Sequence, residues 1–356
     1  MTKNNQLEKK SAIQAMFDAQ KIAFGPIVFQ AAKAMYELGI LAMISSTKDK
    51  GITVEEIAEE LDLSIYSIKV LLELGLSAEI ILIENDRYSL SKTGHFLQNN
   101  KLTQVNLNFV HDVCYQAMFN LKESIQQQKP VGLKVFGDWE TIYEGLSSLP
   151  DQVQKSWFEF DQYYSDMAFS NILPLVLETK PKLILDVGGN TGKWAISCAN
   201  YSNEVKVIIL DLPGQLEKAM HNVKNQDLEE RITGIAANVL EDLPTIPDEF
   251  DVIWMSQFLD CFSETEIKSI LKRFHALMDD QTTLYILELF WDRQRFKATE
   301  FSLHNTSLYF TCIANGVSKM YHSKDMLGLL KSAGFKVTGE TNHIGIGHTL
   351  LECKRK

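Results

Sequence analysis

The sequence predicts an α/β fold with a doubly wound, seven-stranded sheet, preceded by an α-helical domain of winged-helix type. Short apolar runs alternate with helical stretches from residue 183 onward, which is the pattern of a mainly parallel sheet covered by helices. A glycine-rich turn follows the first run, and ligands of such sheets bind at the C-terminal ends of the strands. The seven expected strands cover residues 183–187, 205–210, 233–236, 251–256, 283–289, 336–341 and 349–353.

The length of the chain, 356 residues, suits about two domains or one large domain with additions. We expect a winged-helix domain over residues 1–100 and a sheet domain over residues 176–356. Residues 101–175 are expected to form a helical connector that lines the substrate pocket.

Composition and charge exclude several classes of protein. The formal net charge of −11 argues against general nucleic-acid binding. The five cysteines are scattered without a Cys-x-x-Cys pair, so we expect no metal and no disulfide framework. No apolar signal core opens the chain, and no apolar run approaches the ~18 residues of a membrane span. A reducing cytoplasm without a membrane partner is the expected location.

Residues 51–97 show the pattern of a winged helix. Thr53 is an expected N-cap, with acidic residues in the helical turn that follows it. A second helix and a hairpin around Asn85 and Asp86 complete the pattern. This shape suits either DNA binding or dimerisation.

Charge favours dimerisation. The second helix, residues 65–76, carries one cation, Lys69, and residues 1–100 hold 10 basic against 13 acidic side chains, a net charge of −3. Residues 27–44 are apolar over most of the helical circumference and must be buried on several sides. We therefore expect a homodimer and no nucleic-acid partner.

The turn after the first expected strand carries the strongest functional signal. Asp186 closes the strand, and Gly188, Gly189 and Gly192 let a ligand approach the backbone where a Cβ would clash. A second strand ends in Asp211, whose carboxylate is placed to accept both hydroxyls of a ribose. The ligand is therefore a nucleoside derivative, unless the segment is an ordinary strand–turn–helix crossover without a ligand.

The turn matches neither the dinucleotide fingerprint Gly-x-Gly-x-x-Gly nor a phosphate loop, and it holds no Lys or Arg to meet a phosphate. An acid at its start suits a cationic or zwitterionic ligand such as S-adenosylmethionine (SAM), which carries an amino group and a sulfonium. Asn190 stands at the middle of the turn, and Asn tolerates positive φ well.

Residues 157–169 are dense in aromatic side chains. A core helix is the ordinary interpretation. Because the aromatic residues wrap around the helix, part of them should face a cavity that suits a flat organic substrate. The substrate-binding candidates here are Phe160, Tyr164 and Met167.

The chain from about residue 11 to 353 resembles the plant-type small-molecule O-methyltransferases, a family of class I SAM-dependent methyltransferases that includes the acetylserotonin methyltransferases. The family's Val-Asp-Val-Gly-Gly-Gly-Thr-Gly looks like residues 185–192, and its Asp-Leu-Pro is similar to residues 211–213. The resemblance implies a class I sheet ending in an antiparallel hairpin, a dimerisation domain, SAM as cofactor and S-adenosylhomocysteine (SAH) as product.

The resemblance also implies the residues that hold SAM. Asp211 holds the ribose and Leu212 flanks the adenine, while Asn238 and Phe262 replace the family's adenine-binding acid and Trp. The implied cofactor-binding set is Asp186, Gly188, Gly189, Gly192, Asp211, Leu212, Asn238, Val239, Ser256 and Phe262.

The catalytic segment departs from the family's Leu-His-Asp-Trp-Ser-Asp-Glu. Asp260 stands where the family has its general base, Glu288 matches a Glu that orients that base, and Met320 replaces a second such Glu. Proton transfer from a phenol of pKa ~10 to an Asp of pKa ~3.9 is uphill by ~8 kcal/mol. Asp260 is therefore a base or orienter aided by burial, a recognition residue in an enzyme that attacks through ring carbon, or a residue without a part in the chemistry.

Histidines elsewhere offer a substitute base. His304 and the neighbouring Asn305 fall in a segment that lines the substrate pocket in the family, so His304 joins the catalytic candidates and Asn305 the substrate-binding ones. His322 and His111 are further candidates.

The resulting hypothesis is a SAM-dependent methyltransferase that moves a methyl group to a hydroxyl of a small aromatic metabolite. One alternative is C-methylation of a phenolic ring, because the His that marks O-methylation is missing. Another is a catalytically inactive SAM-binding or winged-helix regulator.

Overall fold

The computed structural model describes residues 10–241, 243–246 and 250–356; the first nine residues, which lack an apolar signal core, lie outside this range. The chain divides into two compact units, Met1–His111 and Asp112–Lys356. The expected connector over residues 101–175 is shared between them. Its first helix belongs to the first unit, and the long helix at its end belongs to the second.

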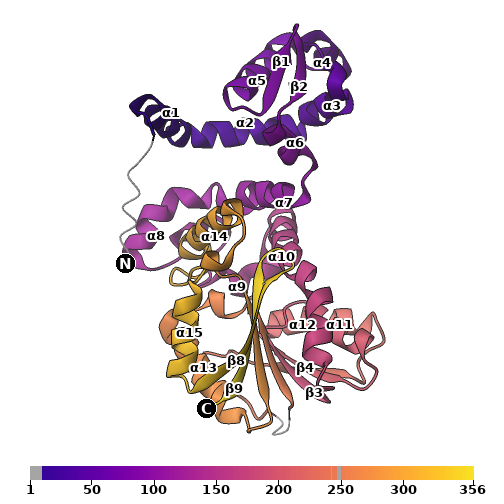
Figure 1. Ribbon diagram of the computed structural model, residues 1–356, viewed down its shortest axis with the longest axis vertical. Helices are drawn as coiled ribbons and strands as arrows, with labels where there is room; N and C mark the ends of the chain where they lie inside the picture. The colour runs from indigo at the N-terminus through magenta and orange to yellow at the C-terminus, as the bar shows by residue number, and fades with distance from the viewer. Residues whose placement is uncertain (1–9, 242, 247–249) are drawn as a thin grey trace. The chain divides into compact units, whose positions relative to one another are not determined.

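The first unit consists of helices and one hairpin (Figure 1). Its elements are α1 (Ala12–Ala23), α2 (Gly25–Glu37), α3 (Ile40–Ser46), η1 (Lys48–Lys50), α4 (Val54–Glu60), α5 (Ile65–Ser77), β1 (Ile81–Glu84), β2 (Arg87–Leu90), α6 (Lys92–Asn99) and α7 (Lys101–Phe109).

Local chemistry explains the expected boundaries in this unit. The Thr53 hydroxyl accepts from the Glu56 N–H (3.2 Å) and the Glu56 carboxylate accepts from the Thr53 N–H (2.8 Å), which confirms the N-cap of α4. The hairpin turn has φ of 49° at Asn85 and 59° at Asp86, as a two-residue type I′ turn requires. Helix, turn, helix and hairpin therefore follow one another as the sequence predicts.

The apolar stretch 27–44 is divided between two helices. Gly39 adopts φ 80° between α2 and α3, and the two helices meet at 61°. Among the described residues no single helix is long and apolar enough to cross a membrane; α2 and α3 reach that length only as this bent pair.

The second unit contains the seven-stranded sheet and its helices. Its strands are β3 (Leu183–Val187), β4 (Lys206–Asp211), β5 (Ile232–Ala236), β6 (Val252–Ser256), β7 (Thr283–Glu288), β8 (Phe335–Ile344) and β9 (His348–Arg355). Its helices are η3 (Ala117–Asn120), α8 (Leu121–Gln127), η4 (Val131–Val135), α9 (Ile142–Gly145), η5 (Leu146–Ser148), α10 (Asp151–Leu177), α11 (Lys193–Tyr201), α12 (Pro213–Lys224), η6 (Leu259–Cys261), α13 (Glu264–Leu277), η7 (Trp291–Arg293), α14 (Lys297–Tyr309), η8 (Phe310–Ala314) and α15 (Ser323–Ser332). A short π-helix, η2 (Val110–Cys114), spans the boundary between the units.

The strand order is β5-β4-β3-β6-β7-β9-β8. The strands from β3 to β7 are parallel, while β9 is antiparallel to both β7 and β8. This is the predicted doubly wound sheet with its final hairpin, and the first five strands match their expected bounds to within one residue at each end. The parallel strands all end at one edge, which carries the expected cofactor residues.

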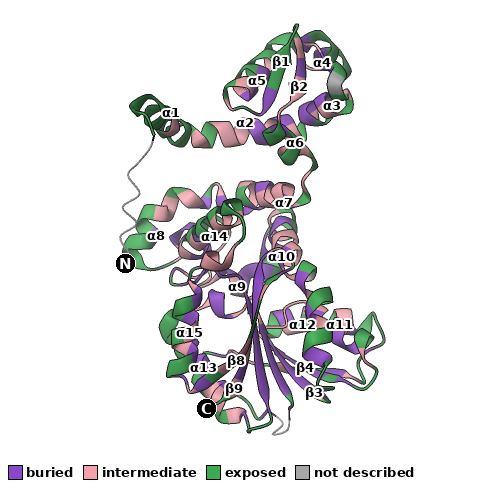
Figure 2. Ribbon diagram, in the orientation of Figure 1, coloured by how far each residue is buried: buried purple, intermediate pink, exposed green. Residues whose placement is uncertain are grey.

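The sheet separates two apolar cores. Ile184 and Leu185 are neighbours on β3 but belong to opposite cores, because side chains alternate along a strand. One core packs the sheet against α13 and α15, and the other packs it against α10, α11 and α12. Figure 2 shows buried strands between helices whose outer faces are exposed. This two-sided burial fixes the strand ends on which the site is built.

Candidate active site

A cavity of about 580 Å³ lies at the C-terminal edge of the sheet in the second unit. We call it the main cavity. The ends of β3, β4 and β6 form one wall, and α10, α14 and η8 contribute the opposite one. A side cavity of about 70 Å³ shares four lining residues with it: Asp161, Gly188, Asn190 and Gln257. The two cavities therefore meet at the glycine-rich turn.

Backbone geometry explains the residues of this turn. Gly188, Asn190 and Gly192 have φ of 74°, 51° and 76°. A Cβ on Gly188 would lie 2.3 Å from a ring carbon of Phe258, so no side chain fits there. Asn190 takes the positive φ expected of it. Gly192 lines neither cavity and instead precedes the first residue of α11.

Asp211, at the end of β4, lies across the turn. Its Oδ2 accepts a hydrogen bond from the Asn190 N–H (2.7 Å) and its Oδ1 accepts one from the Leu212 N–H (2.7 Å). Burial raises the pKa of Asp211, and the two N–H donors oppose that rise. The carboxylate is thus held rigidly at the cavity wall, with acceptor capacity left for hydroxyl donors.

Asp186 lines the side cavity and is buried, and its Oδ2 has no hydrogen-bond partner among the described residues. Burial, followed by the negative charge of Asp211, raises its pKa to about 8. Ser256 and Gly189 line the same space, and the Ser256 hydroxyl also lacks a partner within the described chain. Unsatisfied buried groups of this kind mark a place where a polar ligand binds.

Several lining residues of the side cavity were missed from the sequence, among them the polar residues Lys193, Asp161 and Gln257. Lys193 directly follows the turn, and the Asp161 carboxylate accepts from the Asn190 side-chain amide (2.9 Å). One cation beside two carboxylates complements a zwitterionic amino-acid group. The aromatic stretch of α10 contains three acids, Glu159, Asp161 and Asp166, so the sequence carried no signal that separates Asp161 from the other two.

The side chains expected around an adenine lie together. Leu212, Val239 and Phe262 line the main cavity, as does Asn238. The Asn238 side-chain oxygen already accepts from the Leu240 N–H (3.0 Å), and its amide donates to Glu241 (3.1 Å).

Asp260 lies on η6 at the cavity wall, with only 6% of its surface exposed. Burial raises its pKa to about 7; a thiol contact from Cys261 opposes the rise, and the negative charge of Asp161 adds to it. Glu288 accepts from the backbone N–H groups of Phe258 (3.1 Å) and Leu259 (2.9 Å), so it fixes the loop that carries Asp260. Burial first, and then the charge of Asp260, raises the pKa of Glu288.

Aromatic side chains form much of the remaining wall. Phe160 and Tyr164 line the main cavity as expected. Trp157 also lines it and donates a hydrogen bond from its indole N–H to the Tyr309 hydroxyl (2.7 Å). Met167 does not line the cavity and is 50% exposed, because seven residues beyond Phe160 it lies about 10 Å farther along α10.

The structure corrects the expected placement of His304 and Asn305. Both side chains are exposed, and neither lines a cavity. Leu303 and Thr306 occupy the face of α14 that lines the cavity, one position before and one after the pair. His304 instead packs against Trp291, with ring centroids 4.9 Å apart.

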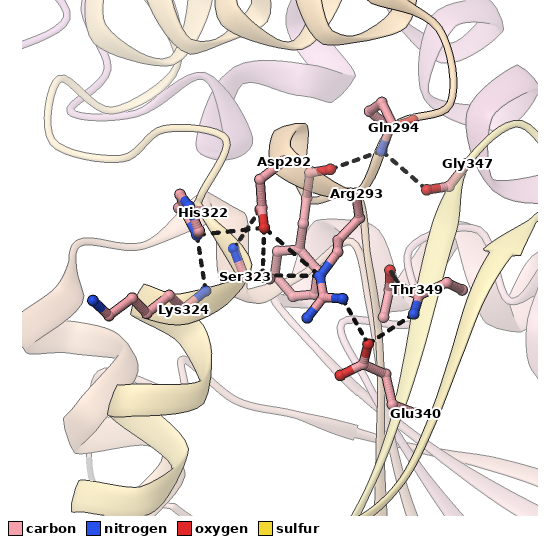
Figure 3. A network of polar contacts seen from close by, with 11 residues as sticks. Asp292, Arg293, Gln294, His322, Ser323, Lys324, Glu340, Gly347 and Thr349 are labelled. Carbon is pink, nitrogen blue, oxygen red and sulfur yellow. Dashed lines mark hydrogen bonds and ion pairs between the residues drawn. The ribbon is translucent and has the colours of Figure 1, made fainter. Parts of the chain in front are cut away.

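His322 belongs to a separate polar network, shown in Figure 3. Its Nδ1 accepts from the Lys324 N–H (3.0 Å) at the start of α15 and lies 3.5 Å from the Asp292 carboxylate. Asp292 also accepts from the backbone N–H (2.7 Å) and the hydroxyl (2.6 Å) of Ser323. No histidine is among the described residues that line either cavity, and the described part of the chain groups no three metal-ligating side chains.

Two family models match the chain. A Dimerisation2-like domain covers residues 17–88, and an O-methyltransferase domain covers residues 119–336. Norreticuline-7-O-methyltransferase of Papaver somniferum is 23% identical over 229 residues, which are 64% of this chain and 60% of that protein. Bacteriochlorophyllide d C-20 methyltransferase of Chlorobaculum tepidum is 23% identical over 279 residues, which are 77% of this chain and 79% of that protein.

Solved structures show the same fold. The SAM-dependent methyltransferase SibL in its apo form has a TM-score of 0.73 at 21% identity, covering 95% of this chain and 98% of that one. The O-methyltransferase NcsB1, in complex with SAM and 2-hydroxy-5-methyl naphthoic acid, has a TM-score of 0.70 at 16% identity, covering 98% of this chain and 100% of that one. Human N-acetylserotonin methyltransferase in complex with SAM has a TM-score of 0.66 at 18% identity, covering 98% of this chain and 99% of that one.

Proposed function

The chain belongs to the O-methyltransferase family, and we propose that it transfers the methyl group of SAM to a hydroxyl of a small aromatic metabolite. One observation carries this proposal. A single cavity of about 580 Å³ is lined both by Asp211, at the place of a ribose-binding acid, and by the buried carboxyl of Asp260. Cofactor and substrate would therefore meet within one cavity.

The residues present fit SAM. Asp211 would accept the ribose hydroxyls, Leu212 and Val239 would flank the adenine, and the side cavity would hold the amino-acid end against Asp186 and Lys193. Bound SAM supplies an electrophilic methyl on a sulfonium, and SAH is the product. The unsatisfied oxygen of Asp186 supports this placement because an ammonium group would satisfy it.

Asp260 is the proposed base or orienter for the attacking hydroxyl. With its pKa near 7, proton transfer from a phenol of pKa ~10 is uphill by only about 4 kcal/mol, compared with ~8 kcal/mol for an ordinary Asp. A positioned base typically contributes ~10²–10⁴-fold to the rate. Glu288 acts through the loop backbone and is a positioning residue.

C-methylation of a phenolic ring is the second candidate. The absence of histidine from the described cavity lining favours it, as does the name of the Chlorobaculum tepidum relative, a C-20 methyltransferase. A ring carbon attack needs no hydroxyl base, and Asp260 would then bind the phenol.

We also propose that the first unit is a winged-helix dimerisation domain of a cytoplasmic homodimer, with α1 and the start of α2 at the interface. Ile13 and Ile22 on α1 are 77% and 80% exposed, and Phe24 and Ile27 beside them are exposed as well. An apolar strip of this kind is typical of an obligate interface. Light scattering at micromolar concentration should give the mass of a dimer, and a monomeric mass contradicts the proposal.

The decisive experiment incubates the full chain with isotope-labelled SAM and a panel of phenols and analyses the products by mass spectrometry. Label on oxygen supports O-methylation, and label on carbon supports the second candidate. SAH binding without transfer to any phenol would favour an inactive regulator.

A further inference from the structure

Tyr143 brings a hydroxyl group to the main cavity from the short helix α9. The hydroxyl oxygen is buried, and it has no hydrogen-bond partner among the described residues. A buried polar group without a partner costs free energy, which a hydrogen bond to a ligand would offset. Neither the cofactor nor the reacting hydroxyl has been assigned to this side chain.

Packing holds the backbone of α9 in place. Ile142, the residue before Tyr143, is fully buried. A Cβ on Gly145 would lie 2.4 Å from the ring of Trp139, so the glycine lets that ring pack against α9. The side-chain amide of Gln215, on α12, donates a hydrogen bond to the Tyr143 carbonyl (3.5 Å). The backbone of Tyr143 is therefore anchored before any ligand binds.

The hydroxyl group of Tyr143 stays protonated and is therefore a hydrogen-bond donor. Burial, followed by the neighbouring Cys261 and Tyr309, raises the pKa of Tyr143 well above its usual range. The Cys261 sulfur lies beside the hydroxyl, but a thiol sulfur is a weak acceptor. Tyr143 therefore retains its donor capacity for a ligand in the cavity.

This donor lies near the carboxylate of Asp260. The charge of Asp260 adds to the raised pKa of Tyr143, and the Cys261 thiol donates to the Asp260 carboxylate (3.6 Å). Tyr143 is not among the described residues that line the side cavity, and the ribose is assigned to Asp211, so the cofactor does not use this donor. A substrate hydroxyl that donates to Asp260 leaves Tyr143 without an acceptor. A second oxygen close to that hydroxyl would supply one.

We propose that Tyr143 is a substrate-binding residue, and that its hydroxyl donates a hydrogen bond to an oxygen next to the hydroxyl that is methylated. The preferred substrate is then an aromatic compound with oxygens on two adjacent ring positions, one a hydroxyl and the other an acceptor. This inference rests on the proposed methyl transfer, since it assigns a specificity-determining residue to the same cavity. Asp260 keeps its role toward the reacting hydroxyl.

The test is equilibrium dialysis of two probes against the full chain saturated with SAH. The probes are 2,3-dihydroxynaphthalene and 3-methyl-2-naphthol, which have nearly the same size and share one hydroxyl. The second probe replaces the neighbouring hydroxyl by a methyl group, which cannot accept a hydrogen bond. We expect the wild type to bind the dihydroxy probe roughly fivefold more tightly or better. Equal affinities or a preference for the methyl probe overturns the inference.

Matched variants assign the preference to Tyr143. Tyr143→Phe removes only the hydroxyl, and it should lower the ratio of the two affinities roughly fivefold while the affinity for the methyl probe stays within about twofold. Tyr201→Phe makes the same change at an exposed position on α11 and should leave the ratio unchanged. An equal loss for both probes in Tyr143→Phe places the hydrogen bond on the shared hydroxyl and contradicts the role of the adjacent oxygen. An unchanged ratio means that water satisfies the Tyr143 hydroxyl, and it also contradicts the inference.

Thermal unfolding of the ligand-free protein separates a ligand-binding role from a structural one. Since the Tyr143 hydroxyl has no hydrogen-bond partner within the described chain, Tyr143→Phe should keep the Tm of the wild type or raise it. A fall of more than about 3 °C would indicate that the hydroxyl stabilises the protein itself, and would contradict its assignment to the substrate.

A titration with SAH separates this inference from the proposed function. If SAH itself does not bind, the methyltransferase proposal fails and the substrate class falls with it. If SAH binds and the ratio of probe affinities is the same in Tyr143→Phe and the wild type, only the role of Tyr143 and the substrate class are wrong.

Discussion

The two sides of the main cavity are built in different ways. The cofactor side consists of strand ends and a turn whose positive φ values and backbone N–H groups set the geometry around Asp211. The opposite side consists of side chains carried by helices α10, α14 and η8, and Asp260 faces the same space from η6, the short helix that follows β6. The geometry of the cofactor side is fixed by the sheet. The geometry of the opposite side depends on which face of each helix points into the cavity and on the side chain at each position of that face.

This difference separates two kinds of effect. Changes on the strand side should alter cofactor affinity, because that side would hold the ribose and the amino-acid end of the cofactor, which do not react. Changes on the helical side should alter turnover, because that side faces the reacting hydroxyl. The predictions below test this separation.

The largest effect is expected for Asp260→Asn. The variant keeps size and hydrogen bonding but removes the charge that would accept or orient the proton. Turnover should fall ~10²-fold or more while SAH affinity, measured by calorimetry, stays within a few-fold. A comparable loss of SAH affinity would contradict the proposed separation between a side that binds the cofactor and a side that faces the reacting hydroxyl.

Asp211→Ala should show the opposite pattern. It removes charge-assisted hydrogen bonds worth roughly 1.5–3 kcal/mol, so the Kd for SAH should rise roughly ten- to a hundredfold. Asp280→Asn, which removes a charge from an exposed position before β7, serves as the charge control for this titration. Unchanged SAH affinity in Asp211→Ala contradicts the placement of the ribose.

The pH dependence of turnover should follow the ionisation of Asp260. Since the active form is the carboxylate, turnover at saturating SAM should rise about tenfold per pH unit below 7 and level off above it. A flat profile between pH 6 and 8 argues against Asp260 as the base.

The free energy of unfolding should change with pH in the direction opposite to turnover. Between about pH 4 and 7 the native Asp260 keeps a proton that the unfolded chain releases, so this group lowers the free energy of unfolding as pH rises. The Tm of Asp260→Asn should therefore fall less over this range than the Tm of the wild type. A steeper fall in the variant contradicts the raised pKa.

The smallest effect is expected for His304→Ala. The side chain is exposed on the outer face of α14 and packs against Trp291, so turnover should stay within about twofold. A loss of turnover above tenfold would indicate that His304 takes part in the chemistry, and would contradict its placement on the face of α14 that points away from the cavity.

The same contrast explains how far the sequence could be interpreted. The strands were predictable because parallel strands buried on both faces appear as continuous apolar runs, and the turn was predictable because positive φ selects glycine and Asn. The two acids stand directly at the ends of two of those runs. The helical side was harder to predict. The i, i+3, i+7 spacing of Leu303, Thr306 and Phe310 places them on the cavity-lining face of α14 and the start of η8, yet the resemblance to the family directed attention to His304. Asp161 was overlooked because the aromatic stretch 157–169 holds three acids, Glu159, Asp161 and Asp166, and the sequence alone does not single out one of them.

Gly188 links the two sides in a way that bears on sequence variation. The ring of Phe258 occupies the volume that any side chain at position 188 would need. Gly188 is therefore constrained twice, by its φ of 74° and by the Phe258 ring, so a smaller residue at 258 would free space without removing the backbone strain of a side chain at 188. A mutant library that randomises position 188 should therefore return glycine, even when position 258 is randomised with it.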